Sequence, residues 1–314
     1  MAKLPDYVLA SKADSTRKKY GYAFNRFCKW SKLYNISPLP ASDIYVALYL
    51  IELSESAKTT SKVDEAVYAI SWAHKLAGYS DPCKSDLVIS VREGSHRKIG
   101  HTTNRKEPIT ADILHKIVSQ FGQNYNNLKD IRIACMCLIS YAGFLRFSEL
   151  SNLRRSHISF YSTHVKLFLV QSKTDIYREG REVVISRTGS ETCPVNMLDR
   201  YLSMAKINVD SNEFIFRSIS YCKSTDDYKL RNSGAISYTR AREILLEALE
   251  SVGVDKSLFG LHSLRSGGAS AAAAAGIEDR IFKKHGRWMS EKAKDGYIKE
   301  DLHARLSVTK NLGI

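Results

Sequence analysis

Paired cysteines are missing from this chain of 314 residues. The cysteines are scattered, with no CxxC pair and no Cys/His cluster at the spacing of zinc ligands. Two of them flank Met136 in an apolar stretch, where small buried thiols are common. We therefore expect a reducing compartment and no structural zinc. The six cysteines are Cys28, Cys83, Cys135, Cys137, Cys193 and Cys222.

Long apolar segments are missing too. Residues 1–5 show no apolar core of a signal peptide, and no run reaches the roughly 18 apolar residues of a membrane-spanning helix. Internal repeats and low-complexity segments are absent, apart from residues 269–275, whose alanines favour a helix. We expect a protein that is neither secreted nor inserted in a membrane.

Acidic residues are few relative to basic ones. Lys and Arg number 47 against 33 Asp and Glu, a net charge of +14, while the hydrophobic content of 44% is ordinary for a globular protein. Such an excess of positive charge points to a polyanionic partner, of which nucleic acid is the first candidate. The alternative is a basic surface without a partner, which charge alone does not exclude.

The first hundred residues have the periodicity of four helices. The first begins near Ser15 with cations in its first turn, where they oppose the helix dipole and so indicate an external anion. A solvated charged face explains these cations equally well. A second helix, from Asp43, is predicted to turn Ile44, Leu48 and Ile51 inward.

Residues 93–108 interrupt this pattern. They are polar and basic and contain two glycines, which is typical of a linker between domains. A basic linker suits a phosphate backbone, although simple solvation is again an equal explanation. The DNA-binding candidates in these N-terminal segments are Arg17, Lys18, Lys19, Arg97, Lys98 and Arg105.

The remainder of the chain mixes helices with a few strands. Thr110 is a helix cap, and a nearly all-apolar segment after it predicts a buried central helix. Two short β-rich runs on either side of a turn predict a pair of strands. The expected helices are 111–121, 131–141, 194–204 and 238–252, the expected strands 165–170 and 181–185, and the expected polar loop 218–233.

Residues suited to phosphodiester chemistry gather in the last third. His262 and Arg265 are three apart, so on a helix they share one face. Arginine forks onto phosphate oxygens, histidine holds or moves a proton, and a phenol such as Tyr297 can be a nucleophile. Upstream, Arg146 follows the buried helix, where its alternative role is an ion pair with Glu149. Lys173 ends the first strand, where a lone lysine is ordinarily a surface residue.

Six positions in order resemble those of the tyrosine recombinase (phage integrase) superfamily. The stretch from Ala142 to Leu150 is similar to the box that carries the first catalytic arginine, and residues 172–175 to the hairpin that carries the catalytic lysine. His262-Ser263-Leu264-Arg265 matches the His-x-x-Arg box. Trp288 takes the penultimate position, and Tyr297 the position of the nucleophile.

The resemblance implies a fold and a division of the chain. The expected class is mainly α with a small antiparallel β-sheet (α+β), in two domains that form a C-shaped DNA clamp. Residues 1–100 would be a helical core-binding (SAM-like) domain, residues 101–108 the linker, and residues 109–314 the catalytic domain. Double-stranded DNA is the implied partner, bound by four protomers on two paired sites, with a monomer expected in the absence of DNA.

The resemblance also implies roles for single residues. Tyr297 would attack a DNA phosphodiester and form a 3′-phosphotyrosyl link, while Arg146 and Arg265 neutralise the transition state without a metal ion, cofactor or ATP. Lys173 would protonate the departing 5′-oxygen. His262 would act as base or hydrogen-bond the phosphate, and the residue types leave both open. Trp288 stands where many bacterial members have histidine, and it can donate a hydrogen bond but cannot act as a base.

Three further interpretations stay open at this point. His285 lies outside the spacing of the family, which favours a local structural role. The wording of the Arg146 and Trp288 motifs resembles recombinases of eukaryotic mobile elements (the DIRS and Crypton kind), which would place the protein in the nucleus. Otherwise we expect it in the cytoplasm with the DNA. The alternatives to recombination are nicking and religation of the type IB topoisomerase kind, and a domesticated DNA-binding protein without catalysis.

Overall fold

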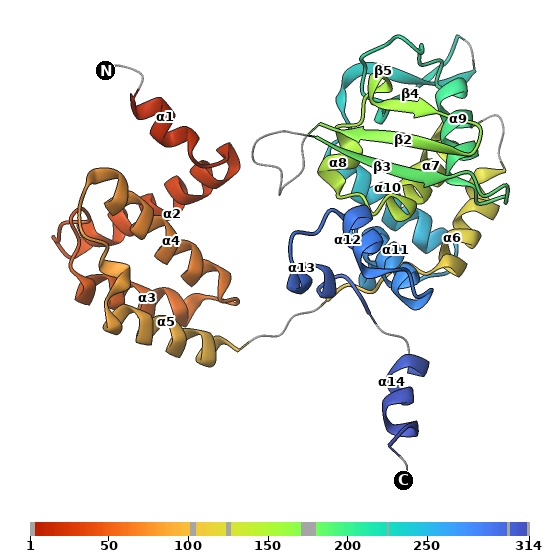
Figure 1. The fold of residues 1–314 in the computed structure, drawn as a ribbon. Coiled ribbons are helices and arrows are strands. Elements are labelled where there is room, and N and C mark those ends of the chain that lie inside the picture. The colour runs from red at the N-terminus through yellow and green to blue at the C-terminus, as the bar shows by residue number, and fades with distance from the viewer. Residues whose placement is uncertain are drawn as a thin grey trace. The chain divides into compact units, whose positions relative to one another are not determined.

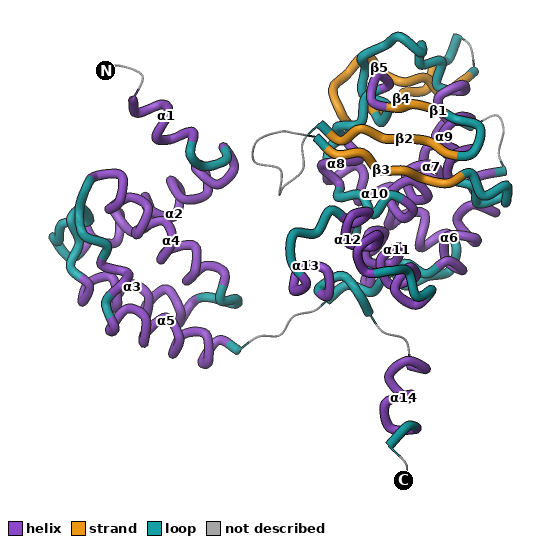
Figure 2. The backbone as a smooth tube through the Cα atoms, viewed as in Figure 1, coloured by secondary structure: helices purple, strands orange, loops and turns teal. Residues whose placement is uncertain are grey.

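The computed structural model describes residues 4–100, 105–123, 127–170, 180–224, 226–299 and 302–312. The chain divides into two compact units, residues 1–104 and 105–314. Helices dominate both units, and antiparallel strands occur in the second (Figures 1 and 2), so the predicted fold class is confirmed. None of the described helices combines the length and apolar character needed to cross a membrane.

The first unit is a helical module. Helix α2 packs against α4 and α3 against α5, around a core that includes Phe27, Leu50 and Ile70. The elements are α1 (Leu4–Ala10), α2 (Asp14–Leu33), α3 (Asp43–Ser56), α4 (Ser61–Ala77), the short turn η1 (Pro82–Lys84) and α5 (Asp86–Ile99).

The predicted inner face of α3 is wrong. Ile44 and Leu48 are each 47% exposed and Ile51 is 42% exposed, whereas Val46 and Leu50 are fully buried. Apolar residues follow one another so closely in this helix that several faces are apolar, and periodicity alone does not select one of them. The packing against α4 and α5 selects the face.

The linker predicted from composition, residues 93–108, begins too early, because α5 continues through residues 93–99. Ser95 is buried and its hydroxyl donates to the carbonyl of Val91 at 2.8 Å, while His96 lies 3.0 Å from the carboxylate of Asp64 in α4. These contacts keep a glycine-containing basic stretch helical. The far end of the predicted linker belongs to the second unit, where the backbone N–H of Glu107 donates to the carbonyl of Leu258 at 2.8 Å.

The second unit is built around α7, as the apolar sequence predicts. Ile131, Cys135 and Ile139 of this helix are fully buried, and α7 contacts α9, α10 and α11. Its elements are α6 (Ala111–Ile117), the π-helical turn η2 (Val118–Gly122), α7 (Leu128–Ala142), α8 (Phe147–Ser151), η3 (Arg155–His157), β1 (Ile158–Phe160), β2 (His164–Leu169), β3 (Arg181–Ser186), α9 (Pro194–Met204), β4 (Arg217–Cys222), β5 (Asp227–Ala235), α10 (Tyr238–Ser251), η4 (Lys256–Leu258), α11 (His262–Ala274), α12 (Asp279–Gly286), α13 (Glu291–Asp295) and α14 (Leu302–Lys310).

Two antiparallel sheets complete this unit. The predicted strand pair is present as β2 and β3, with Val165 opposite Ile185, and β1 pairs with the other edge of β2. The predicted polar loop 218–233 is wrong, because most of it forms the hairpin β4–β5. Partly apolar pairs such as Ile219 with Leu230 hold this hairpin. In Figure 1, α11 and α12 lie next to each other, at the end of the unit opposite β4 and β5.

Candidate active site

The turn between α7 and α8 presents Arg146. Phe144 in this turn has a left-handed backbone, with φ +46°. Arg146 then caps α8: its backbone N–H donates to Glu149 Oε2 at 2.9 Å, and its guanidinium donates to Glu149 Oε1 at 2.8 Å. The ion pair anticipated as the alternative role of Arg146 is therefore present. It holds a cation that is mostly buried, with 11% of its side chain exposed.

Helix α11 carries Arg265 into the interior of the same region. The helix approaches its neighbours closely because Gly267 and Gly268 have no Cβ. A Cβ at Gly267 would lie 2.0 Å from the carbonyl oxygen of Ile109, and one at Gly268 would lie 2.2 Å from that of Tyr141. Arg265 is fully buried and donates to the carbonyl oxygens of Phe144 and Gly286.

One buried carboxylate organises the cations. Glu149 lies 2.8 Å from Arg146, 2.9 Å from Arg287 and 3.9 Å from Arg265. Burial opposes ionisation of Glu149, but Arg287 and then Arg146 outweigh it and lower the pKa of this carboxyl. Burial, with Arg146 and Arg287 nearby, lowers the pKa of Arg265 to about 9, so the guanidinium is still a cation at neutral pH. Three positive charges against one negative charge make the cluster a site for an anion.

Aromatic side chains border this cluster. The guanidinium carbon of Arg265 lies 4.7 Å from the ring centre of Tyr297 and 4.9 Å from that of Trp288. The ring centres of Trp288 and Tyr297 are 5.6 Å apart, and the exposed ring of His262 lies 6.1 Å from Tyr297. Phe144 and Phe282 pack beside Trp288, so one small apolar cluster fixes the indole and the phenol together.

The indole N–H of Trp288 is buried and has no hydrogen-bond partner among the described residues. Native proteins seldom leave a buried donor in this state, because its desolvation is not compensated. The indole ring that carries this donor lies beside the guanidinium of Arg265 and the phenol of Tyr297, and a phosphate oxygen would satisfy the donor. The combination therefore suits attack by the phenol on an anionic centre.

The structure thus brings together five of the predicted catalytic residues, from the turn before α8, from α11, from the turn after α12 and from the segment after α13. Lys173 lies in residues 171–179, outside the described residues. Its predicted role remains a prediction.

Comparison with known proteins identifies the family. The profile of the Phage integrase family matches residues 109–302. An integrase/recombinase XerD homologue from Selenomonas ruminantium is 30% identical over 294 residues, which cover 92% of this chain and 83% of that protein. The chain belongs to the phage integrase (tyrosine recombinase) family. The prediction of a tyrosine-type DNA strand transferase, an enzyme that cuts and rejoins DNA, is confirmed at this level.

Solved structures share the fold of this recombinase at low sequence identity. The Tn1549 transposon integrase in complex with transposon right-end DNA matches with a TM-score of 0.63 and 11% identity, over 96% of this chain and 95% of that chain. The XerH site-specific recombinase, bound to its difH substrate after cleavage, matches with a TM-score of 0.62 and 13% identity, over 95% and 77%. A lambda integrase dimer bound to a core site matches with a TM-score of 0.57 and 17% identity, over 96% and 95%.

The predicted DNA-binding residues of the recombinase are mostly exposed. Helix α2 begins at Asp14, one residue before the predicted Ser15, and Asp14 forms an ion pair with Arg17 that compensates part of the positive charge at the helix start. Lys19 lies 3.4 Å from Glu65. Lys18, Arg97, Lys98 and Arg105 are exposed to solvent.

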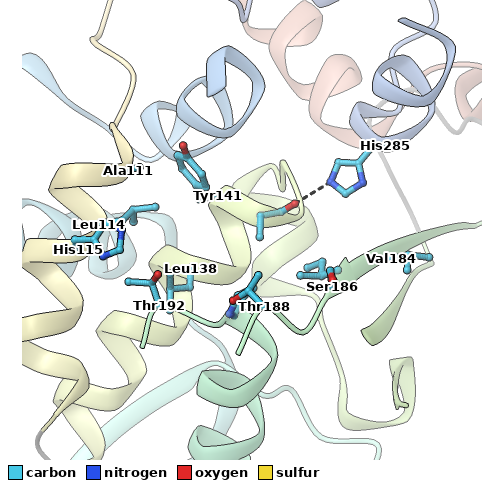
Figure 3. Close-up of a pocket in the computed structure, with 13 residues that line it drawn as sticks. Ala111, Leu114, His115, Leu138, Tyr141, Val184, Ser186, Thr188, Thr192 and His285 are labelled. Atoms are coloured by element: carbon cyan, nitrogen blue, oxygen red, sulfur yellow. Dashed lines mark hydrogen bonds between the residues drawn. The ribbon is translucent and has the colours of Figure 1, made fainter. Parts of the chain in front are cut away.

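A pocket of about 330 Å³ (Figure 3) is lined by residues other than those of the cationic cluster. Mostly apolar side chains of α6, α7 and β3 line it, together with His285, whose Nε2 lies 2.8 Å from the carbonyl oxygen of Ala142. Burial lowers the pKa of His285 and so favours the neutral form of the ring. This contact agrees with the local structural role expected for His285, and the pocket has none of the cations that a phosphate requires.

Sequence reasoning missed two members of the cluster. The sequence pattern predicts Glu149 only as a partner of Arg146, although Glu149 also holds Arg287 and lies near Arg265. The pattern assigns no role to Arg287, the residue before Trp288. A signal was available for Glu149, the one acidic residue in the otherwise apolar or small stretch around Arg146. Arg287 follows two lysines and a histidine, so its charge does not stand out in the sequence.

Proposed function

We propose that this recombinase cleaves DNA with Tyr297 as the nucleophile. The observation that carries the proposal is the position of the phenol, whose ring stacks on the buried guanidinium of Arg265 beside Trp288. The Tyr297 oxygen forms a bond to phosphorus as the bond from phosphorus to the 5′-oxygen breaks. The product is a 3′-phosphotyrosyl link and a free 5′-hydroxyl, and attack by another 5′-hydroxyl reverses the step and exchanges strands.

The surrounding residues stabilise the charge of the transition state and transfer protons. Arg146 and Arg265 offer two forks to the charge that develops on the non-bridging oxygens, and the unpartnered indole N–H of Trp288 offers one further donor. Lys173 donates the proton to the departing 5′-oxygen. His262, 6.1 Å between ring centres from Tyr297, accepts the phenolic proton or hydrogen-bonds the phosphate.

The proposed partner is double-stranded DNA. The net charge of +14 supports it, as do the XerH, Tn1549 and lambda relatives, which are complexes with DNA. We propose that the two units, whose boundary in the chain lies between residues 104 and 105, close on the duplex as a clamp, and that four protomers act on two paired sites. The segment from residue 301 onward would dock on a neighbouring protomer.

The origin in a eukaryotic mobile element, with its nuclear location, rests on the wording of two motifs alone. The relative from Selenomonas ruminantium gives it no support. Integration or transposition of a mobile DNA segment is a role that this chemistry serves in any host, and it is the biological role we propose.

The nucleophile is tested by trapping the covalent adduct. A duplex nicked near the cleavage position loses a short fragment after attack, so the adduct accumulates and is seen on a denaturing gel. Tyr297→Phe should abolish the adduct and leave DNA affinity nearly unchanged, because only the phenolic oxygen is removed. An undiminished adduct in this variant would disprove the assignment. Strand exchange between two duplexes, measured with the wild-type protein, separates recombination from simple nicking and religation.

A further inference from the structure

Arg287 has an unusual backbone. It ends α12 with φ 56° and ψ 39°, a left-handed conformation that is uncommon for a residue with a Cβ. The residue before it, Gly286, has no room for a Cβ, which would lie 1.9 Å from the indole of Trp288. This turn therefore seats Trp288 and directs Arg287 inward, where only 3% of the residue is exposed.

The guanidinium of Arg287 joins two turns of the active site. It donates to the carbonyl oxygens of Gly143 at 3.1 Å and Phe144 at 2.7 Å, in the turn before Arg146. It also donates to the carbonyl oxygen of His285 at 2.7 Å, in the turn before Trp288. Because Phe144 is itself left-handed, these bonds hold a backbone conformation that would otherwise relax.

The same guanidinium occupies one of the two carboxylate oxygens of Glu149, Oε2. Arg287 lies 2.9 Å from Glu149 Oε2, and Arg265 lies 3.9 Å from this oxygen. While Arg287 occupies Oε2, Arg265 keeps its own bonds and its place over the ring of Tyr297. Arg146 is already paired with Oε1. Without Arg287, Oε2 of the buried carboxylate would attract Arg265, which lies 3.9 Å away, and the charge offered to a phosphate would fall.

We propose that Arg287 is a positioning residue of the cleavage reaction, which holds Arg146 and Arg265 toward the scissile phosphate by occupying Glu149 and by bridging the two turns. This inference rests on the proposed function. It assigns Arg287 no contact with DNA and no part in proton transfer.

The test compares two arginines that are equally buried. Arg287→Met removes the proposed positioning residue, and Arg132→Met removes an arginine in α7 that is also 3% exposed and donates to the carbonyl of Arg217 at 2.9 Å. Each variant is given the nicked duplex in two forms. One has the natural phosphodiester, and the other has a methylphosphonate at the cleavage position, which lacks one negatively charged oxygen and so needs less positive charge.

Arg287→Met should slow formation of the adduct on the natural duplex roughly 10²-fold, because the displaced Arg265 no longer reaches the transition state and loss of one such donor costs about this much. On the methylphosphonate the reduction in the rate of adduct formation by Arg287→Met should be at least about tenfold smaller, because this substrate needs less positive charge from the displaced arginines. Arg132→Met should lower both rates by the same factor, as expected for a purely structural residue. Arg287→Lys keeps the positive charge but cannot form the bidentate hydrogen bonds of a guanidinium. It should show the same dependence on the substrate, with a smaller reduction in the rate of adduct formation.

The inference is overturned if Arg287→Met lowers the rate of adduct formation by the same factor on both duplexes, or leaves the rate unchanged on both. If Arg287→Met does not fold, as judged by its circular dichroism, the same two outcomes for Arg287→Lys decide the question. Wild-type protein and Tyr297→Phe are measured in parallel. Absence of an adduct in the wild type overturns the proposed function and this inference with it, whereas a normal wild-type adduct confines any failure to Arg287.

Discussion

Replacing Glu149 by glutamine should strongly destabilise the catalytic unit. The Glu149 side chain is fully buried and lies within 4 Å of Arg146, Arg265 and Arg287. Glutamine preserves the size and most of the hydrogen bonds, so the substitution removes little except the negative charge. Three guanidinium groups would then repel one another in an interior without a counter-charge.

The magnitude follows from the burial of these groups. A pair of unit charges 4 Å apart attracts by about 4 kcal/mol at an effective dielectric constant near 20, and desolvation cancels much of this. Removing one partner of a buried pair leaves that desolvation uncompensated and costs about 3–5 kcal/mol. For a unit of this size we therefore expect the Tm to fall by roughly 6–20 °C.

The assay is thermal and urea unfolding at pH 7. The pKa of Glu149 is lowered in the fold, so its stabilisation is complete above its unfolded pKa of about 4.3 and is lost as the pH falls toward the folded value. Glu213→Gln is the control, because Glu213 lies 2.9 Å from the buried Arg217 but is 48% exposed, and should cost less than about 1 kcal/mol. Equal losses in the two variants would refute the reasoning.

Four further outcomes are expected. Arg146→Ala should slow adduct formation by roughly 10²–10³ with a much smaller effect on DNA affinity. Arg265→Lys should retain little cleavage activity, because an ammonium group cannot form bidentate hydrogen bonds to a phosphate. Wild-type rates in these variants would refute the roles. Gly267→Ala should cost about 1–3 kcal/mol in urea unfolding, because its Cβ would lie 2.0 Å from a backbone oxygen, whereas Gly94→Ala, with open space in α5, should be neutral or stabilising. Log affinity for DNA should fall with log salt by about 0.9 per phosphate contact, and a shallow slope would contradict the clamp. Deletion from Asp301 onward should spare cleavage at single sites and abolish the paired complex on native gels; normal pairing would show that this segment is not the coupling element.

Much of the fold could be predicted because local chemistry and tertiary contacts agree. Helix α4 buries the periodic residues Val63, Val67 and Ile70 and ends at Gly78, whose positive φ suits glycine. Helix α7 is central because it is apolar nearly all round from Ile131 to Tyr141, so almost every face of that stretch favours burial. In both cases a single pattern of residues is compatible with one arrangement only.

The motifs of the active site were also readable without coordinates. Each has a residue type that the chemistry requires, in an order typical of one family, and the family assignment is confirmed. Residue type and order say what a side chain can do. They do not say what lies beside it after folding.

Tertiary structure decided the remainder, wherever local patterns allow several solutions. Helix α3 is apolar on several faces, and contact with α4 and α5 selected one. The hairpin β4–β5 has a polar sequence, and its strands are held by pairs such as Ile219 with Leu230 that become neighbours only in the fold. The same holds for Glu149 and Arg287, which are 138 residues apart in the chain and 2.9 Å apart in space. Burial makes this pairing obligatory, because neither charge is stable in the interior alone.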